Sequence, residues 1–563
     1  MQVGGFLWSM GCASSSSAHS VILNHFPVPT FFCQITTIFA ESQPNIKQSM
    51  KYPIGIQTFE EIITGGYVYV DKTELVYKLV DSGEFYFLSR PRRFGKSLLT
   101  STLESYFLGK KELFKGLAME RLEKDWVTYP VFHIDFSGES YTSEETTRSV
   151  INKFLLKKEA VYGTGEGETT FGLRFIGLLQ RAYEQTGQKV VILIDEYDKP
   201  LTDAIGNTAL QDSNRALLQG LYGVLKNADR YIKFAFLTGV TRYGKPGIFS
   251  AANNLRDISM SDDYATICGI TETELHAYFD GEVQQFSAKL GVSKHDVYTL
   301  LKRKYDGYHF TECSEDVYNP FSLLNALSDR KLDDYWFATG TPTYLTKILK
   351  KKSYDLSKFN NGIFATVESI SSFGNGEENI TAALYQSGYL TIKGYEDDVY
   401  YLGFPNEEVA DGFVRYLLVE YTGKDIDELD ADYLQLRRLV RADDVDGFMS
   451  QIQYIMSQVP FESNDPKQIE ANFRNMVYLM IRFTGLQVAV EHPVMGGRVD
   501  IFFETEACAY LIECKRDLSA QEALAQIDEK KYAERISAPG KRFVKIGANF
   551  STVERNLTEW LVG

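Results

Sequence analysis

The stretch FYFLSRPRRFGKSLL, residues 85–99, decides the fold of this 563-residue chain. Its aromatic and aliphatic start, Phe85 to Leu88, predicts a buried strand, and after a basic turn Gly95 opens a helical pattern. The first N–H groups of a helix and the positive end of its dipole attract an anion. We therefore expect a phosphate-binding loop, in which Lys96 reaches the β- and γ-phosphates and the Ser97 hydroxyl ligates Mg²⁺.

The start of this loop departs from the usual pattern. Arg90 stands where the first glycine is expected, and Pro91 lacks the N–H that a phosphate cradle uses. Two further arginines of the loop can compensate as charge-assisted donors to phosphate. A helix start with a solvated lysine is the alternative for the Gly-Lys-Ser tripeptide alone. The predicted nucleotide contacts of the loop are Arg90, Pro91, Arg92, Arg93, Phe94, Gly95, Lys96 and Ser97.

An acidic turn about a hundred residues downstream supplies the second half of such a site, in KVVILIDEYDKPL. Val190 to Ile194 is an unbroken apolar run, typical of a parallel strand that is buried on both faces. Carboxylates that follow it lie at the edge where open α/β sheets bind ligands. We expect Asp195 to hold Mg²⁺ through water and Glu196 to polarise the attacking water. A solvated acidic turn is the alternative, and the phosphate loop disfavours it.

A third apolar run, Phe234 to Leu237, ends in Thr238. In P-loop ATPases a polar residue at the end of the strand between the two motif strands senses the γ-phosphate, and Thr238 suits that role. A hydroxyl that closes a turn fits equally well. Arg242 is open between a phosphate contact and a surface charge.

The C-terminal part has its own chemistry in GGRVDIFFETEACAYLIECKRDLS, residues 496–519, which predicts two strands joined by a short turn. Glu513 and Lys515 project from one face of the second strand, and Asp500 on the first strand is close enough to join them. We expect the two carboxylates to hold Mg²⁺ and Lys515 to stabilise charge or orient the nucleophilic water of a phosphodiesterase. A solvated ion pair on an edge strand is the default for an isolated Glu-x-Lys, but here both carboxylates interrupt apolar runs.

Segments that resemble a known family occur in order along the chain. They are YPIGIQTFEEI (52–62), YVDKTELV (69–76), SRPRRFGKSLL (89–99), LIDEYDKPL (193–201), LTGVTRYGKPGIFSAANNL (237–255), KYDGYHF (304–310), VYNPFSLL (317–324), YWFATGTPTYL (335–345) and LYQSGYLTI (384–392). Together they resemble the bacterial AAA-ATPase-like proteins that end in a PD-(D/E)XK nuclease domain. Members of that family carry the same RPRRFGKS loop, so Arg90 is a family trait.

The resemblance implies further site residues. Asp71, Lys72 and Thr73 would border the nucleotide pocket. In the C-terminal part, the order of elements resembles the αβββαβ core of the nuclease superfamily, with Glu470 as the first acidic metal ligand and Gln526 as a catalytic residue on the helix that begins at Ser519. Glu491 is open between a metal ligand and a surface residue.

The expected fold class is α/β, in three domains. Residues 50–271 form an AAA-like P-loop NTPase core with a parallel sheet, residues 272–432 a helical lid and winged-helix-like region, and residues 433–563 an α/β restriction-endonuclease-like domain. Residues 1–49 differ, because no charged side chain precedes Glu41. We expect Met50 to be the physiological start, with a disordered leader as the alternative.

Composition narrows the function. A net charge of −16 argues against a protein coated in positive charge, although a local basic groove remains compatible with it. Six cysteines without CxxC spacing disfavour disulfides and zinc and fit the cytoplasm. The apolar stretches of residues 1–49 are too short to span a bilayer.

We expect an ATP-dependent P-loop enzyme that uses Mg²⁺ and is coupled to a nuclease acting on DNA, with RNA as the second substrate. The alternative is a nucleotide-dependent switch or scaffold whose C-terminal domain binds nucleic acid or protein without cleavage. A structural protein would require both motif sets to be accidental. The sequence leaves the oligomeric state open.

Overall fold

The computed structural model describes residues 50–242, 255–337, 343–371, 379–459, 465–494 and 497–563. The predicted extension, residues 1–49, lies outside the described residues, as do residues 243–254 and 338–342 of two of the family-like segments. Residues 51–563 form one compact unit. The domain boundaries after residues 271 and 432 therefore stay predictions.

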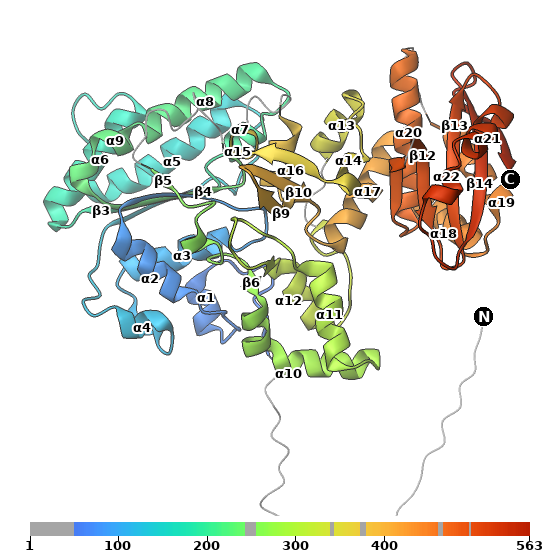
Figure 1. The fold of residues 1–563 in the computed structure, drawn as a ribbon. Helices are drawn as coiled ribbons and strands as arrows, with labels where there is room; N and C mark the ends of the chain where they lie inside the picture. The colour runs from blue at the N-terminus through green and yellow to red at the C-terminus, as the bar shows by residue number, and fades with distance from the viewer. Residues whose placement is uncertain (1–49, 243–254, 338–342, 372–378, 460–464, 495–496) are drawn as a thin grey trace, which may run out of the picture. The chain divides into compact units, whose positions relative to one another are not determined.

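A five-stranded parallel sheet carries the phosphate-loop segment (Figure 1). Its strands are β1 (Phe85–Ser89), β2 (Val131–Asp135), β3 (Val190–Asp195), β4 (Ile232–Gly239) and β5 (Arg256–Asp257). They lie in the order β2-β3-β4-β1-β5. As in the P-loop ATPase arrangement that the expected role of Thr238 assumes, β4 lies between the strand before the phosphate loop and the strand before the acidic turn.

The register brings the carboxyl ends of the core strands to one edge. Ser89 at the end of β1 pairs with Gly239 at the end of β4, and Asp135 at the end of β2 pairs with Asp195 at the end of β3. Every residue of β3 is buried, as expected of a strand covered on both faces. Residues that follow these strands therefore meet, although they are far apart in the sequence.

Helices cover both faces of this sheet. Their bounds are α1 (Phe59–Thr64), α2 (Thr73–Ser82), α3 (Lys96–Phe107), α4 (Ala118–Leu122), α5 (Glu144–Tyr162), α6 (Phe171–Thr186), α7 (Lys199–Thr202), α8 (Thr208–Tyr222) and α9 (Val224–Asn227). In Figure 1, α5, α6 and α8 lie over one face, and α1, α2 and α3 lie over the other. The helix α6 shows why: its buried residues Phe175, Leu178, Leu179 and Ala182 recur at helical spacing and form one apolar stripe.

The segment after β5 is mostly helical. It contains β6 (Ile270–Thr271), α10 (Glu272–Leu290), α11 (Lys294–Tyr305), β7 (Val317–Tyr318), α12 (Pro320–Asp329), α13 (Thr343–Lys351), α14 (Lys358–Asn361), β8 (Ile363–Thr366), α15 (Val367–Ser371), α16 (Ile380–Gln386), β9 (Thr391–Glu396), β10 (Val399–Gly403) and α17 (Glu407–Thr422). β8, β10 and β9 form an antiparallel sheet. Helices beside a small antiparallel sheet are the elements of a winged helix, and that assignment stays a prediction.

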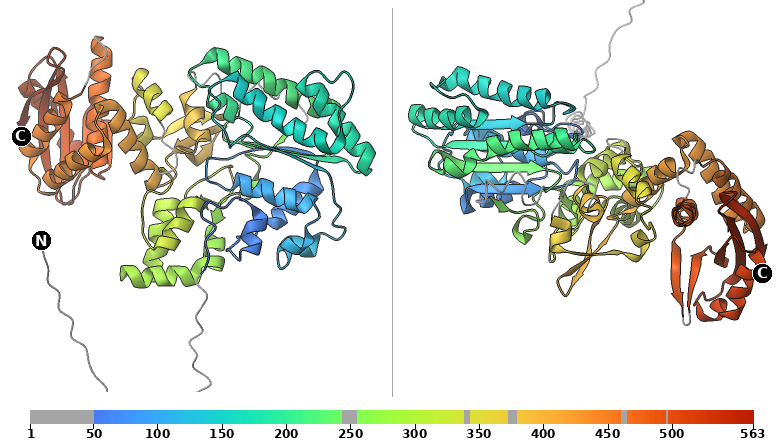
Figure 2. Two further views of the ribbon diagram at one scale, coloured as in Figure 1. Left: turned by 180° about the vertical axis from the view of Figure 1, so that it is seen from behind. Right: turned by 90° about the horizontal axis from the view of Figure 1, so that it is seen from above.

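The C-terminal part contains a second five-stranded sheet, in the order β11-β12-β13-β14-β15. Its elements are α18 (Ile426–Arg441), α19 (Val445–Ser457), α20 (Pro466–Phe483), β11 (Val488–Val494), β12 (Gly497–Glu504), β13 (Cys508–Arg516), α21 (Ala520–Glu529), α22 (Tyr532–Arg535), β14 (Arg542–Ser551) and β15 (Asn556–Val562). Only β13 and β14 pair in parallel. From α20 to β14 the order is αβββαβ, as predicted, with the short α22 added after α21, and Figure 2 shows the strands in orange to red beside their helices.

No helix among the described residues combines the length and the apolar character that a membrane span requires.

Candidate functional sites

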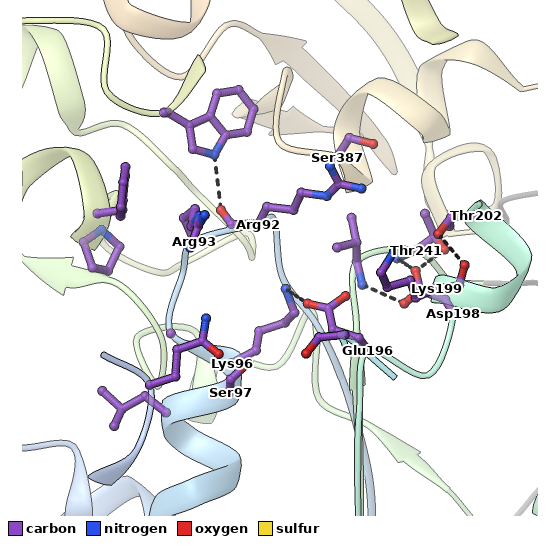
Figure 3. Close-up of a pocket in the computed structure, with 18 of the residues that line it drawn as sticks. Arg92, Arg93, Lys96, Ser97, Glu196, Asp198, Lys199, Thr202, Thr241 and Ser387 are labelled. Carbon is purple, nitrogen blue, oxygen red and sulfur yellow. Dashed lines mark hydrogen bonds and ion pairs between the residues drawn. The ribbon is translucent and has the colours of Figure 1, made fainter. Parts of the chain in front are cut away.

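A cavity of about 790 Å³ opens at the carboxyl edge of the parallel sheet (Figure 3). That volume lies within the range of small-molecule sites. The phosphate-loop residues on its wall are Arg92, Arg93, Gly95, Lys96 and Ser97, and the acidic turn after β3 contributes Glu196 and Asp198. The two halves predicted from separate sequence segments therefore line one cavity.

Unusual backbone conformations shape this edge of the sheet. Gly95 has a φ of 92° and directly precedes α3, which begins at Lys96. Arg93 and Glu196 also lie in the left-handed region, with φ of 67° and 52°. For glycine this conformation is not costly, but for Arg93 and Glu196 it costs about 1–3 kcal/mol each, and such strain is concentrated at ligand sites. The fold thus holds Arg93 of the phosphate loop and Glu196 of the acidic turn in a backbone conformation that is unfavourable for both residues.

Lys96 is buried beside Glu196. Its Nζ lies 3.2 Å from Oε1 of Glu196 and donates to the carbonyl oxygen of Pro91 at 3.3 Å. The Lys96 side chain is 3% exposed, so its charge relies on these two partners. An anion at the start of α3 would therefore compete with Glu196 for the ammonium group.

Asp195 and Ser97, the two predicted Mg²⁺ ligands, lie together. The Asp195 carboxyl is buried, and burial raises its pKa to about 6, while a hydrogen bond from the Ser97 hydroxyl acts in the opposite direction. A cation bound between these oxygens would remove the cost of burying the charge. The donor set therefore fits Mg²⁺, which prefers oxygen ligands.

The end of β4 is fixed by Asp198. Its carboxylate accepts hydrogen bonds from the backbone N–H groups of Val240 at 3.2 Å and Thr241 at 2.7 Å. Thr238, the predicted phosphate sensor, is fully buried, and the Oγ1 atom has no hydrogen-bond partner among the described residues. Thr238 is not on the cavity wall, whereas Val240 and Thr241 are.

Arg90, a predicted nucleotide contact, does not lie on the cavity wall. Its guanidinium donates through Nη1 to the carbonyl oxygens of Ser89 and Ser259 at 2.9 and 2.8 Å, and through Nη2 to those of Tyr264 and Ala265 at 3.3 and 3.2 Å. It also lies over the ring of Phe310. A buried guanidinium needs acceptors, and these carbonyls supply them. Arg90 therefore anchors the start of the loop.

Pro91 and Phe94 are also absent from the cavity wall. Pro91 contributes its carbonyl oxygen to Lys96. The ring of Phe94 packs against Tyr308 and Phe310, with centroids 4.7 and 5.6 Å away. Both residues shape the loop from behind, because an apolar ring gains more from burial than from contact with phosphate.

The segment Asp71 to Thr73 does not line this cavity, but Lys72 lines a smaller cavity of about 100 Å³ together with Phe94 and Gly95 of the phosphate loop, so its place beside the nucleotide stays a prediction. Asp71 accepts hydrogen bonds from the N–H groups of Thr73 and Ala118, both at 2.8 Å. Lys72 pairs with Glu274 at 2.6 Å. These side chains tie α2 to α4 and α10, so their polar groups are already satisfied.

Two residues that the sequence analysis did not single out support the loop. The Trp336 indole donates to the carbonyl oxygen of Arg92 at 3.2 Å, and its backbone N–H donates to Glu408 at 2.7 Å. Burial raises the pKa of Glu408 to about 7. Trp336 belongs to the YWFATGTPTYL segment, which entered the sequence analysis only through the family resemblance. Its aromatic-rich pattern gives no sign of a partner in the phosphate loop.

The second site lies where β12 and β13 adjoin. Asp500 accepts a hydrogen bond from the backbone N–H of Cys514 at 2.7 Å. On β13, Lys515 Nζ lies 3.6 Å from Oε1 of Glu513. Gln526 on α21 joins both, because its Nε2 donates to Glu513 and its Oε1 accepts from Lys515. The four residues predicted to be catalytic in this part of the chain therefore converge.

The carboxylates of this site fit a divalent cation. Burial, followed by the Asp500 charge, raises the pKa of Glu513 to about 7, and burial also raises the pKa of Asp500. The Oε2 atom of Glu513 is buried and has no hydrogen-bond partner among the described residues. A cation between the two carboxylates would satisfy this oxygen and neutralise the repulsion.

Known proteins match both parts of the chain. Residues 53–249 match a family model described as "Predicted AAA-ATPase", and residues 468–560 match the PD-(D/E)XK nuclease superfamily. A relative from Azotobacter chroococcum mcd 1, an uncharacterized protein in the vnfD 5′ region, is 34% identical over 523 residues, which cover 91% of this chain and 98% of the relative. The chain belongs to this AAA-ATPase-like family. It also carries a PD-(D/E)XK nuclease-superfamily domain.

In the nuclease-superfamily domain, Glu470 lies on α20, as the resemblance implied, but away from Asp500 and Glu513. Its carboxylate pairs with Arg516 on the surface, and the described residues contain no group of three or more acidic, histidine or cysteine side chains that could hold a metal. Glu491 is engaged as well, by Arg474 at 2.8 Å and Arg498 at 3.0 Å. Arginines therefore occupy the carboxylates of Glu470 and Glu491. Of the predicted metal ligands in this domain, Asp500 and Glu513 are the two that lie together.

Replacing Arg90 should lower the stability of the AAA-ATPase-like domain, and it should not remove a direct contact with nucleotide. Arg90→Met removes the donors of buried carbonyl oxygens, and we expect a loss of about 3 kcal/mol in the free energy of unfolding, measured by urea denaturation. Arg92→Ala is the matched control, because that side chain is exposed. It should keep the unfolding midpoint and weaken nucleotide binding. The opposite pattern would place Arg90 at the nucleotide.

Replacing Glu513 should change how stability depends on pH in metal-free protein. Since its pKa is about 7 in the folded state against 4.5 ordinarily, the folded state binds the extra proton, and stability falls as pH rises between these values. The thermal midpoint of Glu513→Gln minus that of the wild type, measured in EDTA, should therefore be larger at pH 8 than at pH 5. Glu506→Gln, at an exposed position, should show the same change in thermal midpoint between pH 5 and pH 8 as the wild type. Parallel curves for Glu513→Gln and wild type would contradict the buried-carboxyl account.

Proposed function

We propose that the chain is an ATP-hydrolysing P-loop protein whose nucleotide state governs a Mg²⁺-dependent nuclease acting on DNA, with RNA as the second candidate. The observation that carries the proposal is the convergence of Lys96, Ser97 and Glu196 on one cavity, with the buried Asp195 carboxyl hydrogen-bonded to Ser97. The convergence of Asp500, Glu513 and Lys515 at the second site supports the nuclease half.

At the nucleotide site, each side chain has a distinct task. Lys96 would contact the β- and γ-phosphates, and Ser97 with Asp195 would hold Mg²⁺, which supplies positive charge to the phosphates. Glu196, released from Lys96 by the incoming phosphate, would accept a proton from the attacking water. Arg92 lies on the cavity wall, and no carboxylate among the described residues pairs with its side chain, so it can donate to phosphate.

At the nuclease site, Asp500 and Glu513 would hold Mg²⁺, which would polarise the phosphodiester and acidify bound water. Lys515 would orient the nucleophilic water or stabilise the charge that develops on the phosphate. Gln526 would keep Lys515 beside Glu513, because it hydrogen-bonds both. The raised pKa of Glu513 means that Mg²⁺ must displace a proton at neutral pH.

Coupling between the sites is supported by a run of contacts through α17. Near its N-terminus, Glu408 accepts from Trp336, whose indole holds the phosphate loop at Arg92. Near its C-terminus, the hydroxyl of Tyr421 accepts from Asn475 on α20, 3.1 Å away. A shift of the phosphate loop on nucleotide binding would therefore act on the first helix of the nuclease-superfamily domain through one rigid helix.

A nucleotide-dependent switch without turnover is the second candidate. It is favoured by the ion pair of Glu196 with Lys96, because a carboxylate engaged in this way does not activate water. In that case the nuclease-superfamily domain binds nucleic acid or protein without cutting.

ATP turnover separates these candidates. Lys96→Ala should abolish ATP binding, and Glu196→Gln should retain binding while lowering the hydrolysis rate about 10²- to 10⁴-fold. Binding is measured with a fluorescent ATP analogue and hydrolysis by phosphate release. Lys111→Ala, an exposed lysine near α3, is the control. Binding without hydrolysis in the wild type would favour the switch.

Nucleic-acid cleavage tests the second half. Plasmid, linear duplex, single strands and RNA are incubated with Mg²⁺ or Mn²⁺, with and without ATP. We expect cleavage that Asp500→Ala and Lys515→Ala abolish and that Lys541→Ala, a cation paired with Glu504, leaves unchanged. Cleavage by Lys515→Ala at the wild-type rate would remove the nuclease assignment.

A further inference from the structure

Two arginines beside the nuclease site share one carboxylate. Arg474 on α20 donates from Nη1 to Oε1 of Glu491 at 2.8 Å, and Arg498 on β12 donates from Nη1 to Oε2 of the same residue at 3.0 Å. The side chains of Arg474, Glu491 and Arg498 are 34%, 45% and 67% exposed. The group is therefore open to a ligand from solvent. Its two arginines and one glutamate together carry a net charge of +1.

The strands place this cluster next to Asp500. Arg498 and Asp500 lie two residues apart on β12 and so share a face of the sheet. On β11, Val490 pairs with Ile501 and His492 with Val499, which puts Glu491 opposite Asp500. Glu491 has a φ of 49° within the strand, and a positive φ is uncommon for residues other than glycine. The backbone thus departs from regular strand geometry at Glu491, the residue that pairs with both arginines.

The electrostatic environment links the cluster to the catalytic carboxylates. Burial raises the pKa of Asp500, and among the nearby charges Glu491 acts in the same direction, whereas Lys515 and Arg474 act against it. Around the site, the cations Arg474, Arg498, Lys515 and Arg516 are matched by the carboxylates Glu470, Glu491, Asp500 and Glu513. A divalent cation between the catalytic carboxylates would leave this patch positive and attractive to a polyanion.

The arginines also retain hydrogen-bonding capacity. Glu491 accepts from Nη1 of each arginine, and both side chains are partly exposed. A guanidinium presents donors in a fixed fork that matches two phosphate oxygens, and it makes such contacts better than lysine does. A phosphate that approached the pair could therefore take donors that Glu491 does not use.

We propose that Arg474 and Arg498 bind a backbone phosphate of the nucleic acid next to the one that is cut, and that Glu491 positions the two guanidinium groups for it. The inference rests on the proposed function, because it requires the nuclease-superfamily domain to bind nucleic acid. Arg474 and Arg498 are binding residues in this scheme, and Glu491 is a positioning residue. The phosphate competes with Glu491 for the arginines.

Binding is measured as the fluorescence anisotropy of a labelled DNA duplex, with Ca²⁺ in place of Mg²⁺, over a series of salt concentrations. Arg498→Ala should weaken binding about three- to tenfold and lower the slope of log affinity against log salt by about one, because one phosphate contact is lost. Arg474→Lys, which keeps the charge but not the fork, should weaken binding with little change in that slope. Lys541→Ala is the matched control, since this cation pairs with Glu504 at the far end of β12.

Glu491→Gln separates a phosphate site from a structural ion-pair cluster. Loss of the competing charge should tighten DNA binding if the arginines contact phosphate, whereas a purely structural cluster would give weaker binding together with a lower melting temperature. Unchanged affinity and salt slope in Arg498→Ala, with a wild type that binds DNA, would overturn this inference alone. A wild type that binds neither DNA nor RNA would overturn the proposed function and this inference with it.

Discussion

The guanidinium of Arg90 is buried where β1 ends, and its hydrogen bonds to the carbonyl oxygens of Ser259, Tyr264 and Ala265 join that strand end to the chain after β5. The phosphate loop begins at this anchor. From there the chain needs left-handed turns at Arg93 and Gly95 before α3 can start with Lys96 pointing at Glu196. A loop that carries this much backbone strain keeps one shape only if its first residue cannot move, and the buried charge-assisted hydrogen bonds of Arg90 provide that restraint.

Both sites are built from the same physical conflict. Each places carboxyl groups where burial disfavours their charge, so that the pKa of Asp195 is about 6 and that of Glu513 about 7. Each also places a lysine beside a glutamate, Lys96 with Glu196 and Lys515 with Glu513. A lysine reduces this cost but does not remove it, whereas a divalent cation would. The affinity of both sites for metal would then derive from energy that the fold has already invested in holding carboxylates out of water.

The sequence was sufficient where function follows from local pattern and failed where it depends on distant partners. The buried run before Asp195 and the alternation of Glu513 and Lys515 located both sites, because strand burial and side-chain direction are set by neighbouring residues. The buried position of Arg90 was not foreseen, because its acceptor on Ser259 lies 169 residues away. Trp336 was missed for the same reason, since Arg92 is 244 residues distant. Glu470 occurs at the expected position on α20, but Arg516 takes its carboxylate, a competition that no spacing rule describes.

The strand order has a consequence for how the molecule forms during synthesis. β1 lies between β4 and β5, both far downstream, and Phe85 pairs with Ala235. The phosphate loop therefore leaves the ribosome long before the strands that flank it, and Arg90 lacks its distant carbonyl partners until the chain has passed Ser259, Tyr264 and Ala265. Non-local pairing of this kind is slow and exposes apolar strand edges in the meantime. The emerging segment is aromatic-rich and lacks its neighbours at first, so its nucleotide site is completed only after β3, β4 and β5 have been synthesised.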